Sequence, residues 1–305
     1  MPIENEPFFI NALETETMNP ASTEIDRMSP LEIAQVMNAE DAKVAQAIAQ
    51  ELPQIAHAIE EIAIRLRRGG RLIYIGAGTS GRLGVLDASE CPPTFSTKPE
   101  MVVGVIAGGP SALTLASEGT EDRVEVGRAD LEAVHVGADD AVVGIAASGR
   151  TPYVLGAMAY AREQQACTIG LACNAHTPLE QAVEIMIAPV VGPEVITGST
   201  RLKAGSAQKM VLNMLSTGAM ILLGKTLGNL MVDVHASNYK LEQRAIKIVQ
   251  TATGLTSEQA RVALEAAGGE TRTAIVVGRK NVTPEVARAQ LAAHNDHLRA
   301  ALEAL

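Results

Sequence analysis

Two acidic residues are candidate acid and base catalysts. Glu90 is followed directly by Cys91-Pro-Pro93, so we expect a helix to stop there and the corner to fix its carboxylate. Glu121 lies in Glu118-Gly-Thr-Glu-Asp122, where it can share a helix face with Glu118 three residues earlier. Two carboxyl groups with separated pKa values can supply one proton donor and one acceptor. An acidic first turn favoured by the helix dipole fits the same spacing, and this alternative stays open.

A glycine-rich turn with two hydroxyl groups is the first candidate phosphate loop. Gly76-Ala-Gly-Thr-Ser-Gly81 follows the apolar run Leu72–Ile75 and has the lettering of a dinucleotide fingerprint. That fingerprint needs an acidic residue about 20 positions further on. Here the next apolar run ends in Gly108-Gly109-Pro110 instead. What remains is a strand, a tight turn and a helix start, which together suit a phosphate monoester.

Two further loops contain hydroxyl groups after apolar runs. Ser148-Gly-Arg-Thr151 precedes Pro152, a residue that suits the first turn of a helix, although the same letters also read as a helix cap. Thr197-Gly-Ser-Thr200 forms the third cluster, and Glu194 precedes it as a further candidate carboxylate. Three such loops at one edge favour a sugar phosphate over a nucleotide. We expect the ligand to be bound by Gly78, Thr79, Ser80, Ser148, Gly149, Arg150, Thr151, Glu194, Thr197, Ser199 and Lys203.

The elements that must position these residues form an α/β pattern. Five continuous apolar runs alternate with helical or turn-rich segments, which predicts strands buried on both faces of a parallel sheet. Ligands of such sheets bind beyond the carboxyl ends of the strands, where the three hydroxyl-rich loops lie. The predicted strands are Leu72–Ile75, Met101–Ala107, Ala141–Ala147, Thr168–Ala172 and Glu184–Pro189.

Helical segments flank the predicted sheet. Apolar spacings of three and four predict helix from Pro30 to Arg68, and a long Met- and Leu-rich helix is expected over Lys203–Leu223. A further helix near Tyr239–Ala252 precedes a tail with three short helix-like segments. We therefore divide the chain into an N-terminal helical segment (1–60), a sugar-phosphate domain (61–227), a linking helix (228–252) and a small helical domain (253–305).

Composition excludes several classes of partner. The 305-residue chain has a formal net charge of −10 and no long basic block, so we expect neither nucleic acid nor a membrane as a partner. No apolar run reaches the roughly 18 residues of a membrane span, and the acidic start is no signal peptide. The odd number of cysteines, three, predicts reduced thiols in the cytoplasm, and the spacing of the six histidines predicts no metal site.

The hydroxyl-rich loops resemble those of sugar isomerase (SIS) domains, and longer motifs narrow the resemblance. Gly76–Thr94 is similar to the corresponding stretch of the N-acetylmuramic acid 6-phosphate etherases. The same family resemblance covers four more motifs and extends from about Thr15 to the C-terminus. These motifs are Glu118–Asp122, Gly144–Tyr153, Thr197–Gly205 and Asn229–Asp233.

The resemblance implies a three-layer α/β/α sandwich with a five-stranded parallel sheet, N-terminal helices and a C-terminal helical appendage of the ubiquitin-associated type. It implies cleavage of the lactyl ether of N-acetylmuramate 6-phosphate by a homodimer that needs no metal or organic cofactor. Family placement gives Glu90 the proton transfer to the departing lactate oxygen and Glu121 the C2 proton. Two alternatives are a sugar-phosphate aldose–ketose isomerase and a non-catalytic sugar-phosphate regulator resembling glucokinase regulatory protein.

Overall fold

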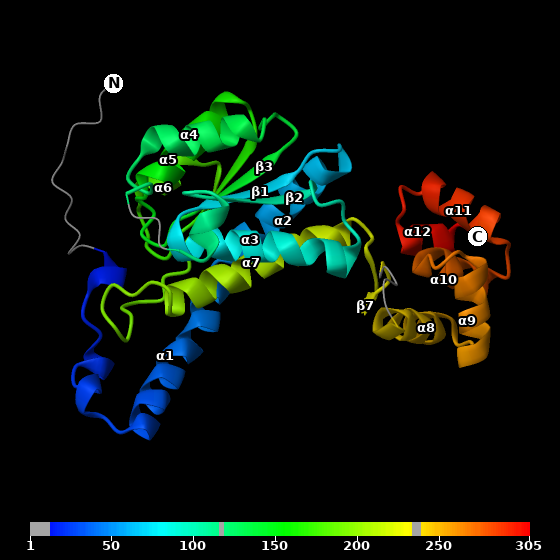
Figure 1. The fold of residues 1–305 in the computed structure, drawn as a ribbon, viewed down its shortest axis with the longest axis horizontal. Helices are drawn as coiled ribbons and strands as arrows, with labels where there is room; N and C mark the ends of the chain where they lie inside the picture. The colour runs from blue at the N-terminus through cyan, green and yellow to red at the C-terminus, as the bar shows by residue number, and fades with distance from the viewer. Residues whose placement is uncertain (1–12, 116–118, 234–238) are drawn as a thin grey trace. The chain divides into compact units, whose positions relative to one another are not determined.

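The computed structural model describes residues 13–115, 119–233 and 239–305 (Figure 1). The chain forms two compact units, one of Met1–Ala88 and Val102–Leu215 and the other of Ser89–Met101 and Ser216–Leu305. No helix in the described ranges combines the length and apolar character needed to cross a bilayer. The division into four segments expected from the sequence stays a prediction.

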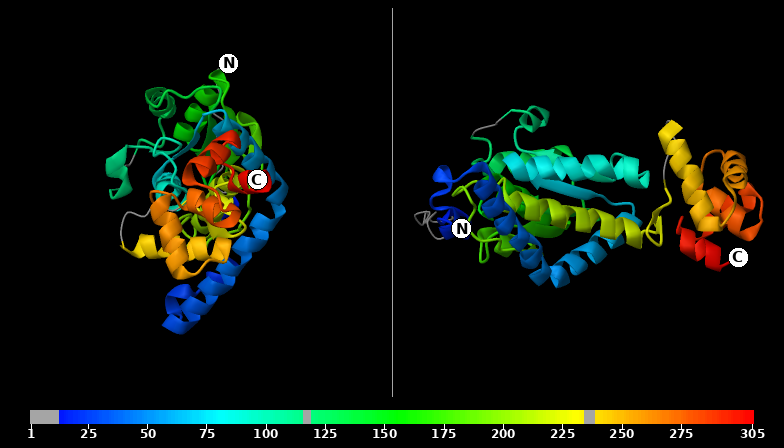
Figure 2. Two further views of the ribbon diagram at one scale, coloured as in Figure 1. Left: turned by 90° about the vertical axis from the view of Figure 1, so that its right-hand side faces the viewer. Right: turned by 90° about the horizontal axis from the view of Figure 1, so that it is seen from below.

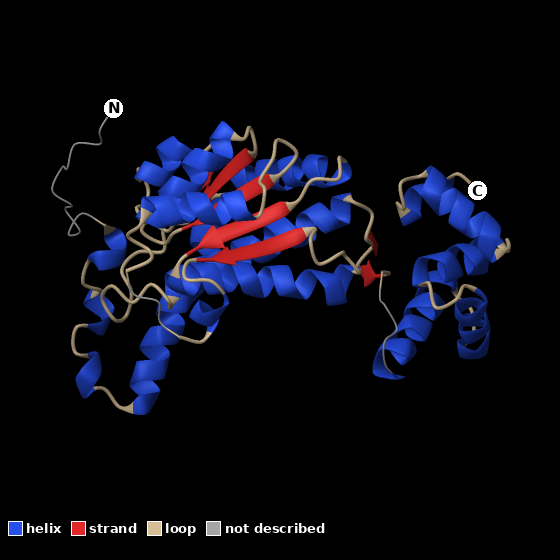
Figure 3. Ribbon diagram, turned by 45° about the horizontal axis from the view of Figure 1, so that its top comes forward, coloured by secondary structure: helices blue, strands red, loops and turns tan. Residues whose placement is uncertain are grey.

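A five-stranded parallel sheet forms the centre of the first unit, as the apolar runs predict (Figure 3). The strand order is β2-β1-β3-β4-β5, and each neighbouring pair is parallel. The last residue of β1, Gly76, pairs with the last residue of β3, Ile145, so the loops after these two strands begin side by side. The strands are β1 (Leu72–Gly76), β2 (Val102–Ile106), β3 (Ala141–Ile145), β4 (Cys167–Leu171) and β5 (Ile185–Ile187).

Helices cover both faces of the sheet, which confirms the expected three-layer class (Figure 1). Ile73 and Ile75 of β1 pack in one hydrophobic cluster with Met158 of α5. Tyr74 points to the opposite face, where its hydroxyl donates to Asp87 of α3 at 2.8 Å. One face carries α4 (Val124–Ala133), α5 (Pro152–Glu163) and α6 (Pro178–Ala182), and the other carries α2 (Leu52–Arg67), α3 (Gly78–Phe95) and α7 (Lys203–Leu222).

Helices α3 and α7 run alongside each other in the same direction (Figure 2). Ser80 near the start of α3 donates to Gln208 of α7 at 2.9 Å. Two turns later, Asn213 of α7 donates to Asp87 of α3 at 2.6 Å. The starts of the two helices therefore lie together at the carboxyl edge of the sheet.

The prediction that a helix stops at Glu90 is wrong, because α3 continues through Pro92 and Pro93 to Phe95. Both prolines lie in the last turns, where each removes only one backbone donor. The amide of Ser96 closes the helix by donating to the carbonyl of Pro92 at 2.9 Å. Glu90 is consequently an exposed residue within a helix.

The predicted N-terminal helix is in fact two helices, α1 (Pro30–Gln50) and α2. A capping box between Ser29 and Glu32 begins α1, with each side chain accepting from the other residue's amide. The chain turns at Glu51, and Pro53 falls in the first turn of α2, where a missing amide costs little. Short 3₁₀ turns at η2 (Glu14–Glu16), η3 (Pro20–Ser22) and η4 (Ile25–Arg27) precede α1, and η5 (Pro110–Leu113) follows β2.

The second unit is built mainly of helices around one hydrophobic cluster, to which α8–α12 all contribute. The tail after α8 holds four helices rather than the three expected. Asn295 and Asp296 adopt left-handed φ values and end α11, and the His297 ring then accepts from the amide of Ala300 to begin α12. The elements are β6 (Thr226–Leu227), β7 (Leu230–Met231), α8 (Tyr239–Thr253), α9 (Ser257–Ala266), α10 (Thr271–Lys280), α11 (Pro284–Ala293) and α12 (Leu298–Glu303).

Candidate functional site

The loop between β1 and α3 needs glycine for close backbone packing. A Cβ on Gly81 would lie 2.5 Å from the carbonyl oxygen of Gly76, and Gly78 has a φ of 54°. The loop therefore brings the first N–H groups of α3, which have no acceptor within the helix, to the sheet edge. Ser80 is buried and bonded to Gln208, whereas Gly78 is exposed and Thr79 is half-buried. Of the two predicted hydroxyl donors, Thr79 is the more accessible.

The loop between β3 and α5 is equally constrained. Gly149 has a φ of 65°, and a Cβ there would lie 2.4 Å from the Thr177 hydroxyl oxygen. The Ser148 hydroxyl accepts from the Arg150 amide at 3.2 Å and keeps its own proton available for a ligand. Thr151 is the N-cap residue of α5, but its side chain makes no capping hydrogen bond. Two hydroxyl groups thus remain as donors for a phosphate group.

Substituting Gly149 by alanine tests this constraint. We expect a loss of unfolding free energy of about 2 kcal/mol or more, because the methyl group adds overlap with Thr177 to the strain of positive φ. Gly192→Ala is the matched control, since Gly192 has a φ of 68° and open space around its Cβ position. Urea unfolding of both variants measures the difference, and equal losses would contradict the steric argument.

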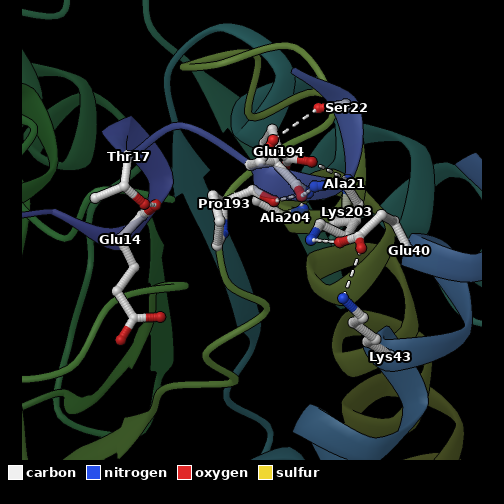
Figure 4. A network of polar contacts seen from close by, with 11 residues as sticks. Glu14, Thr17, Ala21, Ser22, Glu40, Lys43, Pro193, Glu194, Lys203 and Ala204 are labelled. Atoms are coloured by element: carbon white, nitrogen blue, oxygen red, sulfur yellow. Dashed lines mark hydrogen bonds and ion pairs between the residues drawn. The ribbon is translucent and has the colours of Figure 1, made fainter. Parts of the chain in front are cut away.

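Glu194 and Lys203 are fully engaged within the fold (Figure 4). Glu194 is completely buried, and its two carboxylate oxygens accept from the amides of Lys203 and Ala204 at 3.0 and 2.9 Å. The Lys203 ammonium lies 2.7 Å from the carboxylate of Glu40 on α1. The expectation that Glu194 and Lys203 bind the substrate stays a prediction. In this structure their charged atoms hold the start of α7 and join it to α1.

The pair of Glu40 and Lys203 is almost completely buried, with side-chain exposures of 4% and 1%. Burial opposes the ionisation of Glu40, but hydrogen bonds from Lys203 and Lys43 outweigh it and lower the pKa of Glu40 to about 2 from its usual 4.5. Glu40 is therefore a carboxylate throughout the physiological range, and the pair is ionic.

Sequence reasoning missed an N-terminal arm, residues 13–22, that packs against the loops of the site. Thr15 is fully buried, and its hydroxyl accepts from the side-chain Nδ2 of Asn174, which also donates to the carbonyl of Ala147. The carbonyl of Thr15 accepts from the amide of Gly198 at 3.3 Å. The arm thus ties the segments after β3 and β4 to the third loop, where Thr197 is exposed and Ser199 half-buried.

The two candidate catalytic carboxylates are exposed. Glu90 follows Ser80 by ten residues of helix α3, which corresponds to about 15 Å along the axis. Glu121 lies in the turn before α4, and its carbonyl accepts from the amide of Tyr153 at 3.0 Å. The expectation that Glu121 lies on a helix is therefore wrong, and Glu118 lies outside the described residues.

Three thiols and the histidines complete the inventory of reactive groups. Cys91, Cys167 and Cys173 are buried thiols, and burial raises the pKa of Cys167 and Cys173 to about 12. Among the described residues, no three His, Cys, Asp or Glu side chains gather closely enough to hold a metal ion. The described groups that could act in catalysis or binding are thus the exposed carboxylates of Glu90 and Glu121 and the hydroxyl groups after β1 and β3.

Comparisons with known proteins place the chain in a family. Residues 54–162 match the model of the glucokinase regulatory protein N-terminal SIS domain, and residues 228–294 match that protein's C-terminal lid domain. A solved phosphoheptose isomerase from Francisella tularensis shares the fold at 18% identity, with a TM-score of 0.50, over 64% of this chain and all of its own.

Curated relatives are much more similar. An N-acetylmuramic acid 6-phosphate etherase from Rhodopirellula baltica is 56% identical over 95% of this chain and 96% of its own. The Streptomyces coelicolor protein of the same name is 57% identical over 97% of this chain and 95% of its own. The chain belongs to the N-acetylmuramic acid 6-phosphate etherase family.

Proposed function

We propose that this protein cleaves the D-lactyl ether of N-acetylmuramic acid 6-phosphate to give N-acetylglucosamine 6-phosphate and D-lactate. The observation that carries the proposal is membership of the etherase family over nearly the full chain. The enzyme is then a carbon–oxygen lyase acting on a phosphorylated amino sugar.

The reaction proceeds by elimination followed by addition of water. In the open-chain sugar the C1 aldehyde acidifies the C2 proton, which Glu121 removes as a carboxylate base. Glu90 in its protonated form donates to the ether oxygen as the bond from C3 breaks and D-lactate leaves. Glu90, now ionised, takes a proton from water, which adds at C3 of the unsaturated aldehyde. Glu121 returns its proton to C2, so both carboxyl groups end as they began.

The hydroxyl-rich loops bind the 6-phosphate in this proposal. Ser148 and Thr151 supply hydroxyl donors in the loop after β3. The start of α3 supplies the Thr79 hydroxyl and the first backbone amides of the helix. These groups bind an anion without a strongly basic surface, which agrees with the net charge of −10. The steps use carboxylates, hydroxyl groups and water only.

The functional unit in this proposal is a homodimer in the cytoplasm. The 15 Å of helix between Ser80 and Glu90 supports the view that a partner subunit contributes groups to each site. The three cysteines are buried thiols, which suit a reducing compartment.

Incubation with N-acetylmuramic acid 6-phosphate in heavy-oxygen water tests the reaction. We expect release of D-lactate and incorporation of labelled oxygen at C3 of the product sugar, measured by mass spectrometry. A ketose product without lactate would instead indicate an isomerase. Binding of the substrate without turnover would indicate a regulator, and either result would overturn the proposed function.

A further inference from the structure

A pocket of about 310 Å³ lies between the first turns of α3 and α7. Two cationic side chains, Arg201 and Lys209, line it together with the hydroxyl-bearing Thr79 and Ser206. Leu83 and Met210 form an apolar part of the wall, and Gly205 completes it. Cations, hydroxyls and apolar groups are thus present in one small cavity.

The charge of this pocket is not neutralised within the fold. Among the described residues, neither Arg201 nor Lys209 has a hydrogen-bonding or ionic partner for its side chain. Both side chains are exposed, in contrast to Lys203 nearby, whose charge is balanced by Glu40. A chain with a net charge of −10 therefore presents a local site of two positive charges, which suits an anionic group.

The position of the pocket connects it with the predicted substrate loops. Thr79 lies in the first turn of α3, just after β1, and Arg201 follows the third hydroxyl cluster directly. The loop after β3 that carries Ser148 begins one strand away, because Gly76 pairs with Ile145, and adjacent strands lie about 4.8 Å apart. The Ser148 loop and the pocket therefore lie at the same, carboxyl edge of the sheet.

We propose that this pocket binds the lactyl group of the substrate, with Arg201 and Lys209 contacting its carboxylate. This inference rests on the proposed function. N-acetylmuramic acid 6-phosphate carries two anionic groups, a phosphate and a lactyl carboxylate, whereas its sugar product carries only the phosphate. Leu83 and Met210 provide an apolar surface for the lactyl methyl group, and the Ser206 hydroxyl can donate to the carboxylate. Arg201 and Lys209 are then specificity residues that select the ether over other sugar phosphates.

The test compares substrate and product in the Arg201→Met and Lys209→Met variants. We expect the KM for N-acetylmuramic acid 6-phosphate to rise about 10- to 100-fold, since each change removes a charged hydrogen-bond donor. The inhibition constant of N-acetylglucosamine 6-phosphate, which lacks the lactyl group, is expected to stay within about twofold. Lys247→Met, which changes an exposed lysine on α8, is the matched control and should alter neither value.

Each other outcome gives a defined answer. Equal weakening of substrate and product would show that the pocket binds the phosphate and would overturn the proposal, as would an unchanged KM. If the unmodified protein releases no lactate, the proposed function fails. Calorimetric measurement of the binding of both sugar phosphates to the same variants would then still test whether the pocket binds the lactyl group. Only a lactyl site distinguishes the two ligands.

Discussion

Replacing Glu90 by glutamine is expected to lower kcat/KM for D-lactate release by about 10²- to 10⁴-fold, the range for loss of general acid–base catalysis. The amide has nearly the shape of the acid but cannot donate a proton to the departing oxygen. Exchange of the C2 proton with solvent is expected to continue, because Glu121 performs that step. Lactate assays and deuterium incorporation at C2 measure the two reactions separately.

The exposed Glu60 on α2 provides a control for the Glu90 variant. Glu60→Gln should leave both lactate release and C2 exchange unchanged. Lactate release by Glu90→Gln within tenfold of normal would show that another group protonates the leaving oxygen. If both C2 exchange and lactate release are lost, the transfer of the C2 proton would instead be assigned to Glu90.

Removing one member of the buried pair between Glu40 and Lys203 is expected to destabilise the protein strongly. Glu40→Ala leaves the Lys203 ammonium buried without its partner, which costs about 3–5 kcal/mol of unfolding free energy. The double variant Glu40→Leu/Lys203→Met removes both charges and is expected to recover most of that loss. A single variant as stable as the double variant would contradict the importance of the pair.

The same pair predicts how stability depends on pH. The pKa of Glu40 is about 2 in the folded protein and about 4.5 for an ordinary glutamate, so the folded state favours the ionised form. This contribution, about 3 kcal/mol, is present above about pH 5 and is lost as the pH falls towards 2. Urea unfolding between pH 7 and pH 3 should therefore show a smaller decline for the double variant than for the unmodified protein. Parallel declines would exclude Glu40 as a source of the acid sensitivity.

Sequence periodicity predicted the sheet well because both faces of each strand are buried. The runs Leu72–Ile75 and Ala141–Ala147 correspond to β1 and β3, and Pro152 begins α5 as expected. The end of α3 was wrong because a pair of prolines in a last helical turn loses only two hydrogen bonds, which tertiary packing can offset. Local rules thus identified the elements better than their ends.

The site was harder to predict where its contacts join distant segments. Glu40 and Lys203 are 163 residues apart, and no local pattern marks either as half of a buried ion pair. The N-terminal arm has few apolar residues, so periodicity gave no signal for it. The arm is held in place by polar contacts such as that between Thr15 and Asn174, which are brought together only in the folded chain.

The carboxylate of Glu194 occupies the helix start that an external anion would otherwise use. Helix N-termini attract negative groups, and α7 receives one from its own chain through the amides of Lys203 and Ala204. Because Glu194 belongs to the same chain, it competes intramolecularly with any external anion for these amides. An anion near α7 must therefore be bound by side chains rather than by backbone amides. Arg201 and Lys209 are the cationic side chains that can bind it there.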